Sequence, residues 1–495
     1  MTDKVKTFDT EYDLIVVGSG ASGKSAALTA AQAGLRVVIF EKMPQTGGTS
    51  IYAEGTAAFE SSEQKARGVP SNPKYHFPTK AEAYAKFNSY SHYRANVDVV
   101  RSFVDNSAET IDFLKSLGVV YKDVRIAAYD DPNELWCFHL PEGLGAQCQE
   151  ILLAAVEKAG VDIFTSTPVK DLIMDDEAVL GVVAQDMSSG EQLRVGAKAV
   201  VLATGGIGNN PELVAKYTWF ANSAHNMNVL TPAQNVGDGL NMALAAGADP
   251  QNIVSGGLVA VGARNKAMDS HIGAAGCQPC VWVNKTARRF INEGIAENIG
   301  DIGPVWGTQP DGLIYALLDE ADIQRLITDG SEISIGEFVV YGRPLNRLRT
   351  ELDQDVADGV AWKSDTIAGL ARQIGLDPTV LAQTVAEYNA ACDAGEDPRY
   401  FKQARYLRPL RRAPFYAISM APGMMSSAGG IRINGDMQVV DKDYRPIPGL
   451  YAVGLDATGL YGDSYNMEVP GAANGFAHTS GRIAARHFVS TLGGV

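Results

Sequence analysis

The segment 12–41 constrains the fold more than any other part of the chain. An apolar, β-branched run over residues 12–17 leads directly into the turn 18–23, which has the spacing G-x-G-x-x-G. An alanine-rich stretch over 24–34 follows, and a second apolar run ends at Glu41. This order predicts a strand, a tight turn, a helix and a parallel strand, which form a βαβ unit of about 30 residues.

The three glycines of the turn, Gly18, Gly20 and Gly23, each meet a physical need of a dinucleotide site. The first permits the tight turn, the second lets the backbone approach a pyrophosphate, and the third lets helix and strand pack closely. The helix N-terminus, which includes Ala21 and Ser22, then presents unpaired N–H groups and the positive end of its dipole to the phosphates.

Glu41 narrows the choice of dinucleotide. A carboxylate at the end of the second strand accepts hydrogen bonds from the ribose hydroxyls. Because an acidic residue stands here instead of an arginine, a 2′-phosphate is disfavoured. The pattern therefore predicts a dinucleotide, either NAD or FAD, and does not distinguish between them. The alternative for Glu41 is a solvated charge at the strand end.

Composition is that of a large two-domain protein without a disulfide framework. The chain has 495 residues, and 42 Lys and Arg against 57 Asp and Glu give a net charge of −15, which argues against nucleic acid or an anionic membrane as partner. There is no apolar run of about 18 residues, and the first residues lack the order of a signal peptide, so we expect a cytoplasmic protein with no membrane span. Five cysteines agree with a reducing compartment.

The predicted secondary structure changes along the chain and divides it into two domains. Residues 199–206 predict another buried strand that runs into a glycine turn, and strand-like segments followed by a helix return near the C-terminus. Helical stretches and scattered aromatic residues lie between them. We predict an α/β fold: a discontinuous Rossmann-like domain over 1–255 and 411–495, with a second domain inserted over 256–410.

Further motifs follow in a fixed order along almost the whole chain. They are Glu41-Lys42-Met43-Pro44, Gly47-Gly48-Thr49-Ser50, Ala53-Glu54-Gly55, 203–212, Gly237-Asp238-Gly239, 283–293 and 451–454. This series resembles the fumarate reductase and succinate dehydrogenase flavoprotein family, which includes enzymes similar to 3-ketosteroid dehydrogenases. The resemblance implies FAD, a two-piece FAD-binding domain, and an α+β capping domain that closes over flavin and substrate.

The resemblance also implies how FAD is held. Members with covalent FAD carry a histidine just before the Gly-Gly pair, where this chain has Gln45 and Thr46, so we expect noncovalent FAD. A helix starting near Gly471 would direct N–H groups at the pyrimidine end of the flavin; the alternative for its small residues is packing. The predicted cofactor-binding residues are Gly18, Gly20, Ala21, Ser22, Gly23, Glu41, Lys42, Gly48, Thr49, Ser50, Gly55, Val169, Thr204, Gly205, Asp238, Gly454, Gly471 and Ala472.

Family members move a hydride between flavin N5 and one carbon of a C–C bond, while a side chain transfers a proton at the neighbouring carbon. Fumarate reductases use an arginine, and ketosteroid dehydrogenases a tyrosine, at the position that Glu297 holds here. Glu297 is therefore the candidate proton carrier, and its alternative is a surface carboxylate of the cap. His139 matches a histidine that lies against the flavin; a buried structural histidine is the alternative.

The substrate-carboxylate ligands of fumarate reductases are missing. By register, Ser426, Ser427 and Glu468 stand where those enzymes have a His-Thr pair and an arginine. A substrate carboxylate that faced Glu297 and Glu468 without a cation would be repelled and poorly solvated. We therefore expect a substrate other than fumarate or succinate.

The segment 461–471 is similar to a segment of ketosteroid dehydrogenases in which a tyrosine hydroxyl and a glycine N–H hold the ketone oxygen. Such donors stabilise an enolate. Tyr465 and Gly471 are the candidates here, with Tyr461 as second choice because the spacing is two residues longer. Packed aromatic residues are the alternative.

Three functional hypotheses remain open. The leading one is an FAD enzyme that reduces or introduces a C=C bond beside the carbonyl of a neutral cyclic ketone or enone, with electrons exchanged with a separate carrier. The second is an enzyme for an organic acid held by cap arginines, for which Arg264, Arg343, Arg347 and Arg349 are candidates. The third is a flavin electron carrier without a substrate.

The pair Cys277 and Cys280 is interpreted as ordinary thiols, because neither a redox-motif context nor a second pair of zinc ligands accompanies it. The histidines show no metal-ligand spacing. No metal is predicted.

Overall fold

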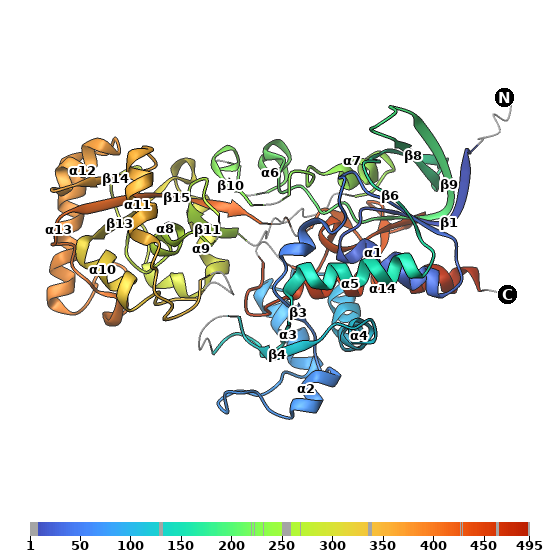
Figure 1. The fold of residues 1–495 in the computed structure, drawn as a ribbon, viewed down its shortest axis with the longest axis horizontal. Helices are drawn as coiled ribbons and strands as arrows, with labels where there is room; N and C mark the ends of the chain where they lie inside the picture. Colours follow the sequence, from blue (N-terminus) through green and yellow to red (C-terminus); the bar gives the residue numbers. More distant parts are fainter. Residues whose placement is uncertain are drawn as a thin grey trace.

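The structure is a computed structural model that describes residues 8–127, 132–218, 220–221, 223–230, 232–249, 259–267, 269–334, 339–425, 427, 429–461 and 465–493. These residues form two lobes that lie side by side along the long axis (Figure 1). The first lobe contains both the N-terminal and the C-terminal segments, and the second lobe contains the yellow and orange part of the chain.

A mixed eight-stranded sheet forms the centre of the first lobe. Its main path runs β17-β18-β9-β1-β2-β6, and the antiparallel strands β7 and β8 continue from β9. The pairs β6 with β2, β2 with β1, β1 with β9 and β9 with β18 are parallel. The strand bounds are β1 Thr10–Val17, β2 Val37–Phe40, β6 Asp162–Phe164, β7 Val169–Asp175, β8 Ala178–Gln185, β9 Gln192–Leu202, β17 Gln438–Val440 and β18 Pro446–Ala452.

The predicted βαβ unit is confirmed: β1 leads through the glycine turn into α1 (Ala21–Gln32), which returns to the parallel strand β2. Gly23 shows why the turn needs glycine, since a Cβ atom there would lie 2.0 Å from the Gly18 carbonyl oxygen. On its other side α1 packs on α14 (Ala472–Leu492), where a Cβ on Gly481 would lie 2.2 Å from the Ser22 oxygen. Close packing on two sides fixes the N-terminus of α1 at the sheet edge.

Further elements surround this sheet. A small antiparallel sheet has the order β3-β5-β4, and β16 pairs with β19. The bounds are β3 Thr56–Ala57, β4 Tyr121–Arg125, β5 Phe138–Pro141, β16 Ile431–Arg432, β19 Ala457–Thr458, α2 Ser62–Arg67, α3 Lys80–Tyr90, α4 Val97–Ser116, α5 Leu144–Lys158, α6 Pro211–Tyr217, α7 Asp238–Ala245 and the 3₁₀ helices η1 Gly48–Tyr52, η2 Ala224–Asn226 and η6 Gly454–Asp456.

The second lobe is built on a six-stranded sheet with the path β10-β15-β13-β12, to which β11 and β14 are added through β15. Trp282 and Trp306 pack edge to face in one of its cores, with ring centroids 5.1 Å apart. The bounds are β10 Asn228–Val229, β11 Val259–Ala263, β12 Val281–Asn284, β13 Ile314–Asp319, β14 Ala361–Ser364, β15 Phe415–Met424, α8 His271–Gly276, α9 Ile299–Gly307, α10 Glu320–Thr328, α11 Leu348–Ala357, α12 Ile367–Gln373, α13 Pro378–Ala394 and the 3₁₀ helices η3 Glu293–Glu297, η4 Pro310–Gly312 and η5 Ala404–Tyr406.

The chain contributes β10 to this sheet before it returns through β11, and it leaves the sheet through β15. Strands β11 and β15 pair antiparallel from Val259 opposite Met424 to Ala263 opposite Met420, and β10 pairs in parallel with the end of β15. The sheet therefore extends beyond residue 410, the expected end of the inserted domain. As a proposal, we place the second boundary between the domains after Met424. The α/β fold class itself is confirmed.

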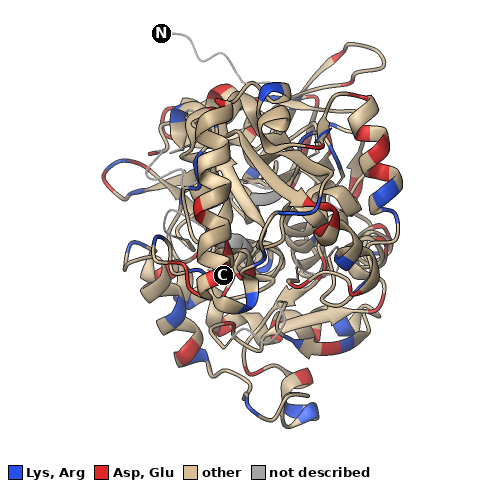
Figure 2. Cartoon of the chain, turned by 90° about the vertical axis from the view of Figure 1, so that its left-hand side faces the viewer, with Lys and Arg blue, Asp and Glu red and all other residues tan. Residues whose placement is uncertain are grey.

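The described helices include none that combines the length and the apolar character needed to cross a bilayer. Figure 2, a view onto the second lobe, shows basic and acidic residues interspersed along the helices.

Candidate functional site

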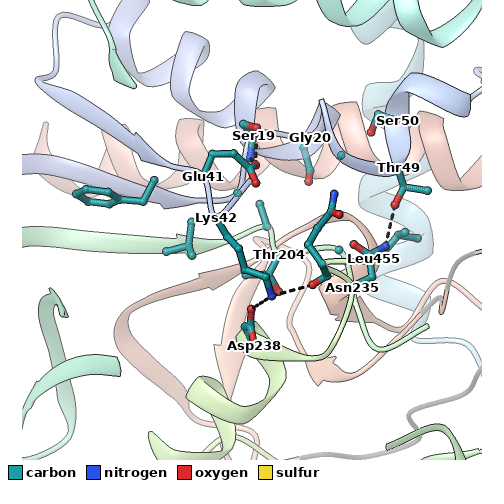
Figure 3. Close-up of a pocket in the computed structure, with 18 of the residues that line it drawn as sticks. Ser19, Gly20, Glu41, Lys42, Thr49, Ser50, Thr204, Asn235, Asp238 and Leu455 are labelled. Atoms are coloured by element: carbon teal, nitrogen blue, oxygen red, sulfur yellow. Dashed lines mark hydrogen bonds and ion pairs between the residues drawn. The ribbon is translucent and has the colours of Figure 1, made fainter. Parts of the chain in front are cut away.

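A pocket opens where the parallel strands end, at the edge of the sheet that carries the glycine turn (Figure 3). Twelve of the predicted cofactor residues line it: Gly18, Gly20, Ser22, Glu41, Lys42, Gly48, Thr49, Ser50, Val169, Thr204, Gly205 and Asp238. They come from five separate stretches of sequence, which the sheet brings together because ligand sites in such folds lie at the carboxyl ends of the strands.

Glu41 lies at the end of β2, and its side chain is buried. Its carboxylate accepts hydrogen bonds from the Ser19 N–H (3.0 Å), the Ser19 hydroxyl (2.5 Å) and the Met43 N–H (2.8 Å). The acceptor is thus held rigidly against the glycine turn. This placement fits an acidic residue that binds ribose hydroxyls.

The wall opposite the turn is tied together by polar contacts between distant segments (Figure 3). The Lys42 ammonium donates to Asp238 Oδ2 (2.7 Å), at the start of α7. The Asn235 amide donates to the Thr49 hydroxyl (2.8 Å). On the other side of the pocket the Ala21 N–H donates to the Ser50 hydroxyl (3.0 Å), which joins η1 to the start of α1.

Asp456 organises the turn after β9, and the sequence analysis missed it. Its buried carboxylate accepts from the Thr204 hydroxyl (2.9 Å), the Gly206 N–H (2.9 Å) and the Thr204 N–H. Burial raises the pKa of Asp456 although these donors oppose the shift. The sequence did contain a signal for this residue, because Asp456 comes just after the motif that ends at Gly454.

The remaining predicted cofactor residues do not line this pocket. A Cβ on Gly454 would lie 2.7 Å from the Ser22 hydroxyl, and one on Gly55 would lie 2.5 Å from the Phe138 ring, so both glycines allow close packing. Gly471 begins α14 with φ +77° and is followed by the buried Ala472. The structure gives Gly23 the packing role described above.

The pocket fits a dinucleotide. Gly20 caps α1 without a side-chain hydrogen bond, and of the first N–H groups of the helix that of Ala21 is bound by Ser50, which leaves those of Ser22 and Gly23 for an anion. A Cβ on Gly18 would lie 2.2 Å from the Ala203 oxygen, so the turn closes tightly against β9. The Glu41 carboxylate supplies the acceptor for the ribose hydroxyls.

Tyr461 and Tyr465 form a buried pair beside the start of α14, with ring centroids 5.1 Å apart. The Tyr465 hydroxyl accepts from the Ala473 N–H (3.2 Å), in the first turn of the helix. Burial raises the pKa of Tyr465 to about 12, so this hydroxyl carries its proton at neutral pH. The structure thus brings the predicted tyrosines together at the predicted helix N-terminus.

The positions at which fumarate reductases are expected to bind substrate carboxylates have protein partners in this chain. Glu468 accepts from the Lys86 ammonium of α3 (2.9 Å), a neighbour that the sequence analysis did not identify because it lies 382 positions away. Ser427 is buried and accepts from the Ile207 N–H (2.7 Å). Ser426 lies outside the described residues.

Glu297 ends η3 in the second lobe, whereas Tyr465 belongs to the first. Its carboxylate accepts from the Tyr406 hydroxyl (2.6 Å) and from the Arg405 guanidinium, and its side chain is 43% exposed. Glu297 does not belong to the pocket lining described above. It faces solvent from a fixed position on the cap.

A buried charge network holds η3 in place. The Arg289 guanidinium binds Glu293 through two hydrogen bonds of 2.7 Å and also binds Asp397 (2.8 Å). The Lys402 ammonium lies 3.4 Å from the same Glu293 carboxylate. This pairing compensates the buried charges and fixes the residues that lead to Glu297.

His139 lies on β5 and is fully buried. Its Nε2 accepts from the Ser61 hydroxyl (2.6 Å), and its Nδ1–H donates to the Cys137 carbonyl (2.8 Å). Burial lowers the pKa of His139 to about 4. With both nitrogens satisfied by the protein, the interpretation as a structural histidine is the better supported one.

This burial predicts acid sensitivity. His478 is also buried, with a pKa lowered by burial to about 3. Because the folded pKa values lie below the unfolded value of about 6.5, the unfolded chain takes up more protons, and stability is lost as the pH falls below 6.5. Each histidine should lower the free energy of unfolding by about 2 kcal/mol between pH 7.5 and pH 5.

Urea unfolding of the wild type and of His139→Gln at these two pH values checks the expectation. The variant should lose about half of the wild-type change. An equal change in both proteins would contradict it.

The cap arginines and cysteines have ordinary protein partners. Arg349 pairs with Glu320, Arg347 with Glu351 (2.9 Å), and Arg264 with Asn226 (2.8 Å), whereas Arg343 lines a small pocket of the second lobe. The five cysteines, all within the described residues, form no disulfide, and burial raises the thiol pKa values of Cys277 and Cys280. Within the described part of the chain, no group of three metal-binding side chains comes together.

Comparison with known proteins agrees with the geometry. The model of the FAD binding domain family matches residues 13–469. A vinyl phenol reductase from Lactiplantibacillus plantarum is 34% identical over 487 residues, which cover 96% of each chain. A cytochrome-type fumarate reductase from Shewanella frigidimarina is 27% identical over 465 residues, which cover 91% of this chain and 72% of that protein.

Among solved structures, a 3-ketosteroid Δ1-dehydrogenase from Sterolibacterium denitrificans superposes with a TM-score of 0.76 over 97% of this chain and 100% of that one, at 21% identity. At this identity the match supports the fold alone. The predicted resemblance to flavoprotein reductases and dehydrogenases and the predicted FAD are confirmed, and noncovalent binding is compatible with Gln45 and Thr46 before the glycine pair. The chain belongs to the FAD binding domain family and is an FAD-dependent oxidoreductase of the class that acts on CH–CH or C=C bonds.

Proposed function

We propose that this enzyme reduces, or in the reverse direction forms, a C=C bond conjugated with the oxygen of a neutral ring compound, such as a cyclic enone or a vinyl phenol. One observation carries the proposal: just before α14, Glu468 stands where a cation would be needed to hold a substrate carboxylate, and the neighbouring Lys86 ammonium is already paired with Glu468. A substrate carboxylate would meet an acidic side chain there. The relative that reduces vinyl phenol supports a neutral substrate.

The chain's own groups suit this chemistry. FAD, when bound, accepts or delivers the hydride. For a cyclic enone, the protonated Tyr465 hydroxyl, at the N-terminus of α14, donates to the ketone oxygen and stabilises the negative charge that develops there as hydride adds to the C=C bond. With a vinyl phenol, the same hydroxyl binds the phenol oxygen and orients the ring. Tyr461 packs against it and keeps water out, and the Gly471 N–H is the second proposed donor.

Glu297 is proposed to move the proton at the carbon that does not exchange the hydride. Tyr406 and Arg405 hold its carboxylate, and its exposure on the cap gives it access to solvent for proton exchange. Electrons are proposed to come from, or go to, a separate carrier.

A matched pair of substrates tests the proposal. The enzyme is reduced chemically without oxygen, and 4-vinylphenol or 4-hydroxycinnamate, which differs by one carboxylate, is added while the flavin absorbance is followed. We expect 4-vinylphenol to restore the oxidised flavin band and the carboxylate analogue and fumarate to leave it unchanged. Equally fast reoxidation by fumarate would contradict the proposal.

A further inference from the structure

A buried lysine stands behind the cofactor pocket. Lys24 belongs to the first turn of α1, and its side chain is 1% exposed. Its ammonium group donates to the backbone carbonyl of Gln149 on α5 (3.1 Å). A buried ammonium normally has an anionic partner, because taking a charge out of water is costly.

The titratable groups that interact electrostatically with Lys24 come from three elements. Glu41 of the cofactor pocket and Glu157 of α5 both act on Lys24 electrostatically and raise its pKa. The larger effect is burial, which lowers the pKa of Lys24 to about 8. From α14 the neutral His478 faces the same region, and its own pKa is lowered in part by Lys24. The amine therefore lies within Coulombic reach of a residue that lines the pocket.

The position of this charge on its helix is also unfavourable. Lys24 lies at the positive end of the α1 dipole, where anions are stabilised and cations are not. Helical side chains lean toward the N-terminus, which here is the glycine turn that faces the pocket. Without the cofactor, the Lys24 cation is therefore buried at a helix end that favours an anion.

We propose that Lys24 is a binding determinant for the pyrophosphate of the cofactor, acting through its charge from behind the glycine turn. Two phosphate charges at the N-terminus of α1 balance the buried ammonium and the helix dipole together. Lys24 does not belong to the pocket lining, so its effect on the pyrophosphate is electrostatic. This inference concerns FAD alone and is independent of the proposed substrate.

The sequence of the turn raises a second possibility, a direct contact between Lys24 and a phosphate. Residues 18–25 also match the pattern G-x-x-x-x-G-K-S, in which a lysine reaches phosphates directly from a loop. In this protein Lys24 already belongs to α1, and its amine is turned onto α5. A through-space effect and a direct contact differ in how strongly removal of the charge weakens binding.

The experiment compares Lys24→Met with Lys158→Met, which removes the same charge from an exposed position on α5. The full-length holoenzyme is diluted serially, and released FAD is measured by its fluorescence; ADP and adenosine are then used as competitors. We expect the Kd for FAD and the inhibition constant of ADP to rise about tenfold in Lys24→Met, as for one charge at about 10 Å. Adenosine affinity, and all constants of Lys158→Met, should stay unchanged.

The wild type gives a second readout that needs no variant. As the pH rises through about 8, Lys24 loses its charge in the cofactor-free protein, so FAD affinity should fall above pH 8 and stay level below it. The fall should be absent in Lys24→Met. A pH-independent wild-type affinity would overturn the proposal even if the variant failed to fold.

Two further results separate charge from packing. Removing a buried charge whose burial outweighs the attraction of Glu41 and Glu157 should leave the melting temperature of Lys24→Met unchanged or higher, although FAD binds more weakly. An unchanged Kd for FAD would overturn the proposal. Equal weakening of ADP and adenosine with a lower melting temperature would also overturn it, because Lys24 would then only join α1 to α5.

Discussion

Replacing Glu297 with glutamine should lower turnover with a neutral ring substrate by a factor of about 100 or more, because the substituted amide cannot carry the proton. Bound FAD should be unchanged, since Glu297 lies in the second lobe and the cofactor pocket in the first. Glutamine keeps the size of the side chain and one acceptor for the Tyr406 hydroxyl. Steady-state kinetics and the flavin content of the purified protein check both parts.

The matched control is Glu396→Gln, which neutralises an exposed carboxylate elsewhere in the second lobe. It should retain wild-type turnover. If Glu297→Gln kept more than half of the wild-type turnover, Glu297 would be a surface carboxylate of the cap. A loss of FAD in that variant would show that its effect is structural.

Gly23→Ala should abolish FAD binding and lower the free energy of unfolding by about 3 kcal/mol, the cost expected of severe overpacking. The added Cβ would lie 2.0 Å from the Gly18 carbonyl oxygen and 3.2 Å from a methyl group of Val16. Helix α1 must then move away from β1, which displaces the N–H groups that face the phosphates. Urea unfolding and the ratio of flavin to protein measure the two effects.

Gly34→Ala provides the matched control at the other end of α1. Its Cβ would have no atom within 4 Å, and only the φ of +86° opposes the substitution, at a cost of about 1 kcal/mol. This variant should keep its FAD. Full FAD content in Gly23→Ala would show that the close packing of α1 on β1 is not required by the site.

The local part of the site could be predicted from the sequence. Hydrophobic runs, glycine spacing and the position of Glu41 are properties of about 30 consecutive residues, and the βαβ unit places them without help from the rest of the chain. The tyrosines near α14 could also be predicted from the sequence, because they precede the N-terminus of this helix by a few positions. Their roles toward a substrate stay predictions.

Contacts between distant segments could not be predicted in this way. Lys86 and Glu468, or Thr204 and Asp456, come together only through the tertiary fold, and no periodicity in one segment reports the charge of the other. The expected repulsion at Glu468 is therefore weaker than the sequence suggested, because Lys86 balances the charge. The same limit applies to Lys24, whose burial depends on α5 and α14.

The antiparallel pairing of β11 with β15 has a mechanical consequence. Strand β10 also pairs with the end of β15, so three strands that join the second lobe to the rest of the described chain form one twisted ribbon. We expect a rotation between the lobes to turn these strands together, because a paired ribbon resists bending within its plane more than across it. We therefore expect rotation about this ribbon to be the main motion that changes the position of Glu297 relative to Tyr465.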